Sequence, residues 1–271
     1  MPELPEVETT RRGLAPLTTG RILEHIVVRH RQLRWPVAEE LSSLAGHPVM
    51  ALERRSKWLL WRFERGTVLW HLGMSGSFRG WMNPPDPGPH DHIDVQIEGG
   101  HCIRYTDPRR FGAVLWQPGS DPMQHARLRS LGPEPLEAAF SGDLLWQRSR
   151  GRKAPIKNFI MDGRIVVGVG NIYAAESLFE AGIHPRRAAG RISRARYQTL
   201  ASVIRQTLAR AIDVGGTSLR DFTVGDGTPG YFGQELKVYG RAGQPCLTCS
   251  TSLKSGVIGQ RSTVWCPKCQ R

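Results

Sequence analysis

The sequence has no apolar run of the roughly 18 residues that a membrane-spanning helix requires. It also has no recognisable secretory leader, because its first residues, MPELPEVE, are acidic where a signal peptide is basic and then apolar. We therefore expect an intracellular protein. Internal repeats and low-complexity segments are absent as well. Hydrophobic residues make up 39% and charged residues 23% of the chain, a composition that excludes global disorder and is sufficient for a packed core.

Acidic residues are few: 24 Asp and Glu stand against 37 Lys and Arg, which gives a net charge of +13. So large a positive charge on a globular chain points to a polyanionic partner, with nucleic acid first and a membrane surface second. A basic surface that serves only solubility is the alternative that composition alone leaves open.

Cysteine is also scarce, with five in 271 residues, and in a reducing compartment these are not expected to form disulfides. Four of them form two pairs, Cys246-x2-Cys249 and Cys266-x2-Cys269, separated by 16 residues. This spacing is typical of a four-cysteine zinc site, in which two tight turns bring four thiolates to one ion. Such a site has no open coordination position, so we predict one structural zinc. The small basic hairpin between the pairs would need this metal to fold.

Strand signals dominate from about residue 21 to residue 117. Apolar and polar residues alternate over 93–105 around the turn Gly99-Gly100, and a second hairpin is expected over 58–72. The proline-rich segment 83–89 is expected to be a loop.

Helical patterns occur at the start of the chain and again after about residue 121. The first helix should begin at Pro5, which suits a first turn, and end at Gly13 or Pro16. The later expected elements are a helix over 172–180, a helix over 193–214 capped by Ser193, and a mobile glycine-rich loop over 217–232.

The N-terminus has a chemical feature of its own. Pro2 is a small penultimate residue, which favours removal of Met1 and would leave a secondary amine at the chain end. An α-amine has a pKa of about 7.7–8.0, well below that of lysine, and a helix N-terminus lowers this pKa further. Attack of such an amine on a sugar C1′ would form a Schiff base, with Glu3 and Glu6 available for proton transfer. Taken alone, a capped helix without catalysis explains the same start more simply.

Gly168-Val169-Gly170-Asn171 leads directly into the helix expected from residue 172. Backbone N–H groups at such a helix start bind anions. A nucleotide-cofactor fingerprint is not supported, because its third glycine and the surrounding strand–helix–strand unit are missing. The segment therefore predicts a contact with phosphate.

Several segments are distinctive in combination. They are PELPEVE at the start, HLGMSG at 71–76, YTDPRRFGA at 105–113, VGVGNIYAAESLFEAGIHP at 167–185, DGTPGYF at 226–232, VYGR at 238–241 and the four-cysteine finger. Together, in this order and over essentially the whole chain, they resemble bacterial formamidopyrimidine-DNA glycosylase.

The resemblance implies an α+β fold. Its N-terminal lobe would be a β-sandwich with flanking helices, and its C-terminal lobe would combine a helix–two-turns–helix motif with the four-cysteine zinc finger, with DNA between the lobes. The implied boundaries are residues 1–130 for the catalytic β-sandwich lobe, 131–236 for the helical DNA-binding lobe and 237–271 for the finger.

The resemblance also implies an activity: a bifunctional DNA glycosylase and AP lyase of base excision repair. Such an enzyme would excise oxidised purines (8-oxoguanine and formamidopyrimidines) from double-stranded DNA and cut the strand by β,δ-elimination. It would act as a monomer in the bacterial cytoplasm, associated with the nucleoid through DNA. The alternatives are an endonuclease VIII-like enzyme for oxidised pyrimidines and a non-catalytic zinc-finger protein that binds damaged DNA. Leu4 and the intact set of Met74, Arg109 and Phe111 favour the purine enzyme over the endonuclease VIII-like one. The presence together of Pro2, Glu3 and Lys57 argues against the non-catalytic protein.

Site residues are carried over from the same resemblance. Pro2 corresponds to the nucleophile, Glu3 to the general acid/base, Lys57 to the lysine of proton transfer in strand cleavage, and Arg261 to the finger arginine that contacts phosphate and donates a proton in the last elimination. The residues expected to contact DNA are His90, Arg109, Arg152, Lys157 and Asn171, together with Met74 and Phe111.

Three of these contacts have a specific purpose. Met74, Arg109 and Phe111 would fill the space that a flipped-out nucleotide leaves, with Arg109 bonded to the opposite cytosine. Arg152 departs from the family pattern, in which lysine is usual, but either side chain neutralises phosphate.

Overall fold

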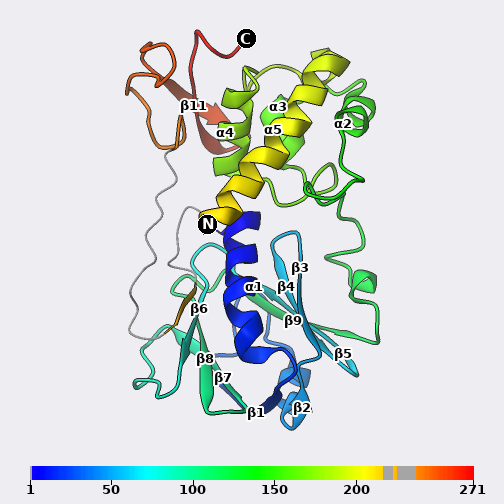
Figure 1. Cartoon of the computed structure of the whole chain (residues 1–271), viewed down its shortest axis with the longest axis vertical. Coiled ribbons are helices and arrows are strands. Elements are labelled where there is room, and N and C mark those ends of the chain that lie inside the picture. The colour runs from blue at the N-terminus through cyan, green and yellow to red at the C-terminus, as the bar shows by residue number, and fades with distance from the viewer. Residues whose placement is uncertain (1, 216–221, 225–235) are drawn as a thin grey trace. The chain divides into compact units, whose positions relative to one another are not determined.

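A computed structural model of the chain describes residues 2–215, 222–224 and 236–271 (Figure 1). The chain forms two compact units. Unit 1 contains residues 1–130 and 215–233, and unit 2 contains residues 131–214 and 234–271. No helix in the described part of the chain is both long enough and apolar enough to cross a membrane.

Unit 1 opens with helix α1 (Leu4–Thr18), which has Pro5 in its first turn as expected. The expected end at Gly13 or Pro16 is wrong, because the helix continues through both residues. Pro16 removes only one backbone hydrogen bond close to the helix end, and the fully buried Leu14 holds this part of the helix against the core. Burial of the apolar face therefore outweighs the local helix-breaking signals.

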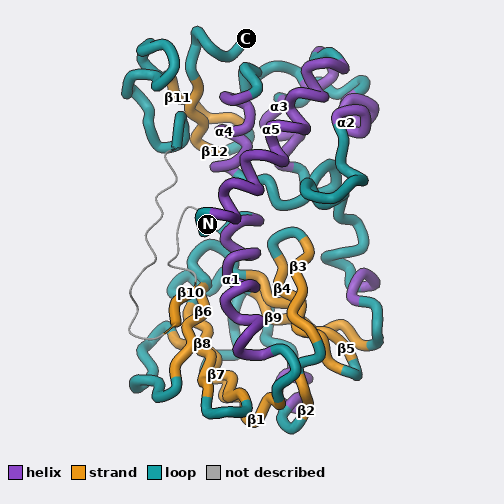
Figure 2. Tube along the Cα trace, in the orientation of Figure 1, coloured by secondary structure: helices purple, strands orange, loops and turns teal. Residues whose placement is uncertain are grey.

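Unit 1 contains two β-sheets, whose strands are drawn in orange in Figure 2. The six-stranded sheet has the order β10-β6-β8-β7-β1-β2, and the four-stranded sheet has the order β3-β4-β5-β9. The strands are β1 (Ile22–Val28), β2 (His47–Pro48), β3 (Ala51–Arg55), β4 (Trp58–Phe63), β5 (Gly66–His71), β6 (Ser77–Trp81), β7 (Asp91–Ile97), β8 (His101–Thr106), β9 (Ala113–Pro118) and β10 (Phe222–Val224).

The two sheets share one hydrophobic core. Trp61 and Trp70 come from the four-stranded sheet, and Phe78 and Tyr105 from the six-stranded sheet. The ring centroids of Trp70 and Phe78 lie 5.1 Å apart, and those of Trp70 and Tyr105 lie 5.3 Å apart. These contacts join the inner faces of the sheets and confirm the predicted β-sandwich.

The strand predictions are largely confirmed. Hairpin β4–β5 corresponds to the expected pair over 58–72, hairpin β7–β8 to the pair over 93–105, and segment 83–89 has no regular structure. One strand was not expected: β10, inside the predicted loop 217–232, pairs in parallel with β6. The other residues of that predicted loop, 217–221 and 225–232, lie outside the described residues.

Unit 2 is built from helices. They are α2 (Gly142–Ser149), α3 (Ile156–Met161), α4 (Asn171–Glu180) and α5 (Arg194–Asp213), with a short 3-10 helix at Ala189–Arg191. Unit 1 has two further 3-10 helices, at Glu39–Leu44 and Pro122–Gln124. Helices α4 and α5 confirm the two predicted helices, and the Ser193 hydroxyl accepts the N–H of Arg196 as the expected N-cap.

The last part of unit 2 is a hairpin of strands β11 (Lys254–Ile258) and β12 (Arg261–Trp265). The hairpin shares a hydrophobic cluster with α4, in which Phe179 packs near Val264 and the buried cysteines. The finger and helix α4 therefore belong to one compact unit.

Candidate functional site

The start of α1 places two predicted catalytic residues side by side. Pro2 is buried and precedes Glu3, which is 1% exposed and forms the N-cap of the helix. The Glu3 N–H donates to Glu6 Oε2 at 2.9 Å, so Glu6 completes a capping interaction. The positive end of the helix dipole at this point lowers the pKa of a nearby amine.

Lys57 lies in the two-residue turn between β3 and β4, where Ser56 has φ of +57°. The lysine is half-buried. Cross-strand pairing places Trp58 opposite His71, with ring centroids 4.8 Å apart. Lys57 therefore lies at the tip of the β3–β4 hairpin, next to Trp58, whose ring packs on the His71 imidazole.

His71 was not singled out from the sequence, although it begins the HLGMSG segment. Its Nδ1 accepts the N–H of Gly73 at 3.0 Å, so the ring uses this nitrogen as an acceptor. Burial first, and then the charges of Lys57 and Arg34, lower the pKa of His71 to about 4. The ring is therefore neutral at pH 7 and adds no positive charge beside Lys57.

Three expected DNA-contact residues lie on two loops of unit 1. Met74 follows β5, and Arg109 and Phe111 follow β8. The side chains of Met74 and Phe111 are 41% and 44% exposed, which is unusual for large apolar groups. The Arg109 guanidinium lies over the Phe111 ring, 4.9 Å from its centroid. His90, the fourth expected contact in unit 1, is exposed next to the start of β7.

In unit 2, the Gly-rich segment leads into α4 as predicted, with Gly170 as N-cap and Gly168 at φ of +79°. Asn171 is the first residue of the helix, and its Nδ2 donates to the Ser262 carbonyl at 3.1 Å. Its Oδ1 is buried and accepts no hydrogen bond from any described residue. The Asn171 amide therefore links the expected phosphate site to the finger hairpin.

Lys157, one of the residues expected to contact DNA, lies inside unit 2. It is fully buried, and its Nζ donates to Thr263 Oγ1 at 2.6 Å and to the Ser262 carbonyl at 3.2 Å. An ammonium enclosed in this way has no exposed donor for phosphate. Its place in α3 instead joins that helix to strand β12 of the finger.

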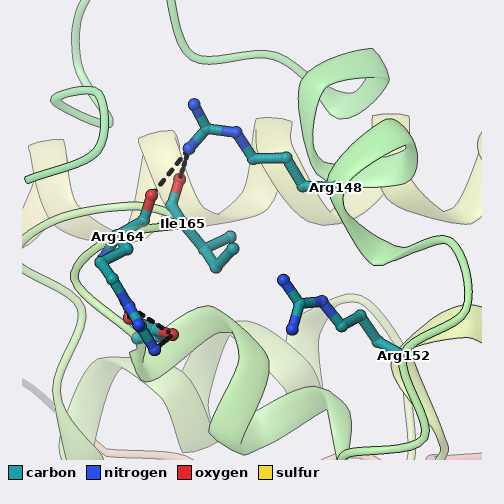
Figure 3. Close-up of a pocket in the computed structure, with 5 residues that line it drawn as sticks. Arg148, Arg152, Arg164 and Ile165 are labelled. Atoms are coloured by element: carbon teal, nitrogen blue, oxygen red, sulfur yellow. Dashed lines mark hydrogen bonds and ion pairs between the residues drawn. The ribbon is translucent and has the colours of Figure 1, made fainter. Parts of the chain in front are cut away.

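Arg152 lines a pocket of about 340 Å³ together with Arg148, Asp162, Arg164 and Ile165. Arg148 donates to the carbonyl oxygens of Arg164 and Ile165, and Arg164 pairs with Asp162 at 2.8 Å. Figure 3 shows the Arg152 guanidinium directed into the pocket from the side. Arg152 is exposed, and its charge contributes, after that of Arg164, to lowering the pKa of Asp162 in the same pocket. The exposed guanidinium can also reach an anion from solvent.

The four cysteines of the finger fit one zinc ion. Their sulfur atoms all lie within 4.8 Å of one another, with Cys249 and Cys266 3.5 Å apart and Cys246 and Cys269 4.0 Å apart. A tetrahedral zinc with bonds of about 2.3 Å separates its ligands by roughly 3.8 Å. The predicted zinc site is therefore confirmed in its ligand set. Cys102, the fifth cysteine, is buried elsewhere.

Arg261 begins β12 immediately after the hairpin turn and is exposed. The turn residues Gly259 and Gln260 both have positive φ, +57° and +62°, as a tight two-residue hairpin requires. A side chain at Gly259 would lie 2.5 Å from the Asn158 side chain, so the turn rests directly on α3. This contact fixes the point from which Arg261 projects.

A second contact fixes the entry of the chain into the finger. Glu176 on α4 is 6% exposed, and its carboxylate accepts the backbone N–H groups of Lys237, Val238 and Tyr239 at 2.8–3.0 Å. These residues belong to the VYGR segment and the residue before it. The expected DGTPGYF segment at 226–232 lies outside the described residues.

Comparisons with known proteins agree over the length of the chain. Residues 1–114 match the family model for the formamidopyrimidine-DNA glycosylase N-terminal domain, residues 131–223 that for its H2TH domain, and residues 243–271 a zinc finger found in FPG and IleRS. The formamidopyrimidine-DNA glycosylase of Alcanivorax borkumensis is 58% identical over 271 residues, and that of Pseudomonas putida strain GB-1 is 57% identical over 272 residues. Each alignment covers 100% of both proteins.

Solved structures give the same result. The MutM (Fpg) protein from Thermus thermophilus matches with a TM-score of 0.86 and 37% identity, over 99% of this chain and 98% of that chain. A complex of Lactococcus lactis Fpg with DNA containing an abasic site matches with a TM-score of 0.90 and 29% identity, over 100% of both chains. With relatives of this identity over its full length, the chain belongs to the formamidopyrimidine-DNA glycosylase family.

Proposed function

We propose that this chain removes oxidised purines from duplex DNA and cuts the strand at the resulting abasic site, with the Pro2 amine as nucleophile. The observation that carries this proposal is the position of Pro2 directly before the positive end of α1, beside the buried carboxyl-bearing residue Glu3. Members of the formamidopyrimidine-DNA glycosylase family are DNA glycosylases with AP lyase activity.

The proposed reaction starts when the neutral Pro2 amine forms a bond to C1′ of the damaged nucleotide. The glycosidic bond breaks, its electron pair leaves with the base, and Glu3 moves the proton that this step requires. The enzyme then holds the sugar as an iminium, which acidifies the C2′ proton. Loss of that proton breaks the C3′–O bond, with Lys57 assisting proton transfer. A second elimination breaks the C5′–O bond, with Arg261 as proton donor.

DNA binding is assigned to both units. In unit 2, the exposed Arg152 and the start of α4 at Asn171 would meet phosphate oxygens, while the zinc holds the hairpin that carries Arg261. In unit 1, the exposed apolar groups of Met74 and Phe111 would enter the space left by the flipped nucleotide.

Arg109 would read the base across from the lesion. Its guanidinium has two donors for the O2 and N3 acceptors of cytosine, and its stacking on Phe111 restricts its orientation.

Oxidised purines are the favoured substrates over oxidised pyrimidines. The Lactococcus lactis relative has been solved with DNA containing N7-benzyl-Fapy-dG, and MutM with DNA containing carbocyclic 8-oxo-G. We assign the same lesion class to this chain, acting as a monomer in the bacterial cytoplasm at the nucleoid. A non-catalytic DNA-binding role is disfavoured by the presence of Pro2, Glu3 and Lys57 together.

The test is borohydride trapping on an 8-oxoguanine:cytosine duplex, because reduction of the iminium joins the enzyme covalently to DNA. An N-terminal tag that blocks Pro2 should abolish trapping and leave duplex binding nearly intact. Pro2→Gly should retain partial trapping, since a primary amine still forms a Schiff base. Glu3→Gln should lose base excision but still cut preformed abasic sites. Equal trapping by tagged and native protein would instead identify a lysine, with Lys57 first, as the nucleophile.

A further inference from the structure

The two loops that carry Met74, Arg109 and Phe111 touch each other through their backbones. Gly73 has φ of +63°, and a Cβ at this position would lie 2.3 Å from the Phe111 carbonyl carbon and 2.5 Å from the Gly112 nitrogen. No side chain fits there, so the close approach requires glycine. The two loops are therefore one assembly, and whatever fixes one of them also fixes the other.

Asp107 lies at the centre of this assembly and is fully buried. Its Oδ2 accepts the Gly112 N–H at 2.8 Å and the Tyr105 hydroxyl at 3.2 Å. Its Oδ1 accepts the Ser75 hydroxyl at 2.6 Å, and Ser75 Oγ in turn accepts the Arg109 N–H at 3.2 Å. One carboxylate thus holds the residue after Met74, the residue after Phe111 and, through Ser75, the backbone of Arg109.

The main chain of Asp107 extends the same assembly. Its N–H donates to the His90 carbonyl at 3.0 Å, and its carbonyl oxygen lies 2.8 Å from His92 Nε2. The loop that carries His90, the fourth expected DNA contact of unit 1, is thereby tied to the same residue. All the groups named around Asp107 belong to the loops or to the strand ends that carry them.

The chemistry of Asp107 explains why it can organise these loops. The two oxygens of the Asp107 side chain accept three donors at once, the Ser75 hydroxyl, the Tyr105 hydroxyl and the Gly112 N–H. Within the described part of the chain, the ion pairs next to Asp107 join Arg104 to Asp91 and Asp94 and leave Asp107 out. A buried carboxylate without a cation depends on its hydrogen bonds, so each of these donors is held firmly. Burial raises the pKa of Tyr105 well above its usual 10, and its hydroxyl therefore remains a donor.

We propose that Asp107 is a positioning residue: it holds the two loops so that Met74, Arg109 and Phe111 enter the space left by the flipped nucleotide together. It thereby determines how strictly the enzyme requires cytosine opposite the lesion. The inference rests on the proposed role of Met74, Arg109 and Phe111. Asp107 acts only through these loops and does not contact the DNA. It thus governs recognition of the opposite base rather than chemistry at C1′.

The experiment compares Asp107→Asn with the native enzyme on 8-oxoguanine paired with cytosine and with adenine. If the amide oxygen keeps the Gly112 N–H and the Tyr105 hydroxyl, its NH2 group faces Ser75, whose hydroxyl can then only accept from it. The Ser75 oxygen would have to accept this NH2 and the Arg109 N–H at once, so the contact that positions Arg109 is altered. We expect the ratio of excision opposite cytosine to excision opposite adenine to fall at least about fivefold, part of what a two-point base contact provides. Single-turnover trapping at a preformed abasic site, measured with enzyme in saturating excess over the DNA, should fall less than the cytosine-to-adenine ratio does, since Pro2 is untouched.

Asp94→Asn is the matched control. Asp94 is a buried residue of β7, in the six-stranded sheet that also contains β8. Its Oδ1 accepts Arg104 Nε at 2.7 Å, and it does not contact either loop. Its amide variant should lose stability but keep the native cytosine preference. Ser75→Ala removes only the hydroxyl that links Asp107 to the Arg109 N–H, at a half-buried position. It should give an intermediate loss of cytosine preference, and it can be measured even if Asp107→Asn does not fold.

A double variant separates positioning from general damage. Adding Asp107→Asn to Arg109→Ala should cause no further loss of cytosine preference, because both changes act on one contact. Native preference in folded Asp107→Asn and Ser75→Ala, or an equal loss in Asp94→Asn, would overturn the inference. Unchanged preference in Arg109→Ala would instead refute the proposed role of Arg109, which makes the two failures distinguishable.

Discussion

Replacing Lys157 by Met tests whether this lysine reaches DNA or acts from inside unit 2. Met preserves the length of the side chain and removes the charge. The structure shows the ammonium buried, with Thr263 Oγ1 at 2.6 Å and the Ser262 carbonyl at 3.2 Å as its acceptors. Ser262 keeps a second donor, the Asn171 amide, but the Thr263 oxygen loses its donor.

Two magnitudes follow from this arrangement. Hydrogen bonds to a charged group contribute about 1.5–3 kcal/mol each, and part of this is offset because an ammonium no longer has to be buried. We therefore expect Lys157→Met to lower the free energy of unfolding by about 2 kcal/mol. Each phosphate contact contributes about 0.9 to the slope of log affinity against log salt, and a buried lysine contributes nothing to it. The slope should therefore remain unchanged.

The assay is fluorescence anisotropy on an undamaged duplex over a series of salt concentrations, together with urea unfolding. Arg152→Gln is the control, because this arginine is exposed and its charge is available to phosphate. It should reduce the slope by about 0.9 and leave stability nearly unchanged. If Lys157→Met reduces the slope as much as Arg152→Gln does, Lys157 contacts phosphate directly and our account of its burial is wrong.

Three further perturbations test other parts of the structure. Cys246→Ser should abolish binding of the single zinc, measured by metal analysis, and weaken duplex affinity, whereas Cys102→Ser should change neither; retained zinc in the first variant would contradict the site. Because the folded-state pKa of His71 is about 4 against about 6.5 when unfolded, stability should fall as pH decreases from 6.5 to 4, by up to about 3 kcal/mol more than in His71→Gln. Parallel pH–stability curves for the two proteins would disprove this. Glu176→Gln places an amide against three backbone donors and should cost about 1–3 kcal/mol in urea unfolding; a smaller loss than in an exposed control, Glu137→Gln, would refute the capping role.

Features with a local sequence signature were predictable. The zinc ligands follow from two short spacings, and α5 follows from its helical periodicity and the Ser193 cap. The end of α1 was mispredicted because Gly13 and Pro16 are local signals, whereas the helix is held by burial of its apolar face in the core. Local propensity gave way to tertiary packing there.

The features that sequence reasoning missed depend on distant residues. Lys157 looks like a surface lysine in sequence, and its acceptors lie more than 100 residues further along the chain. His71 and Asp107 lie within segments that resemble the family, yet nothing in those segments states that one is neutral beside Lys57 and that the other joins two loops. Such roles arise only when separate strand ends are brought together by the sandwich.

The path of the chain has a consequence for any attempt to divide this protein. Unit 1 is assembled from residues 1–130 and from a later segment that includes β10, so a cut between residues 130 and 131 leaves β10 joined to the chain of unit 2. Strand β10 pairs with β6, which would otherwise be the edge strand of the six-stranded sheet. A fragment that stops at residue 130 would present β6 with unpaired backbone groups, a template for pairing with other molecules. Soluble expression of the sandwich alone should therefore require the distant segment around 222–224 to be supplied, as a fused or co-expressed strand.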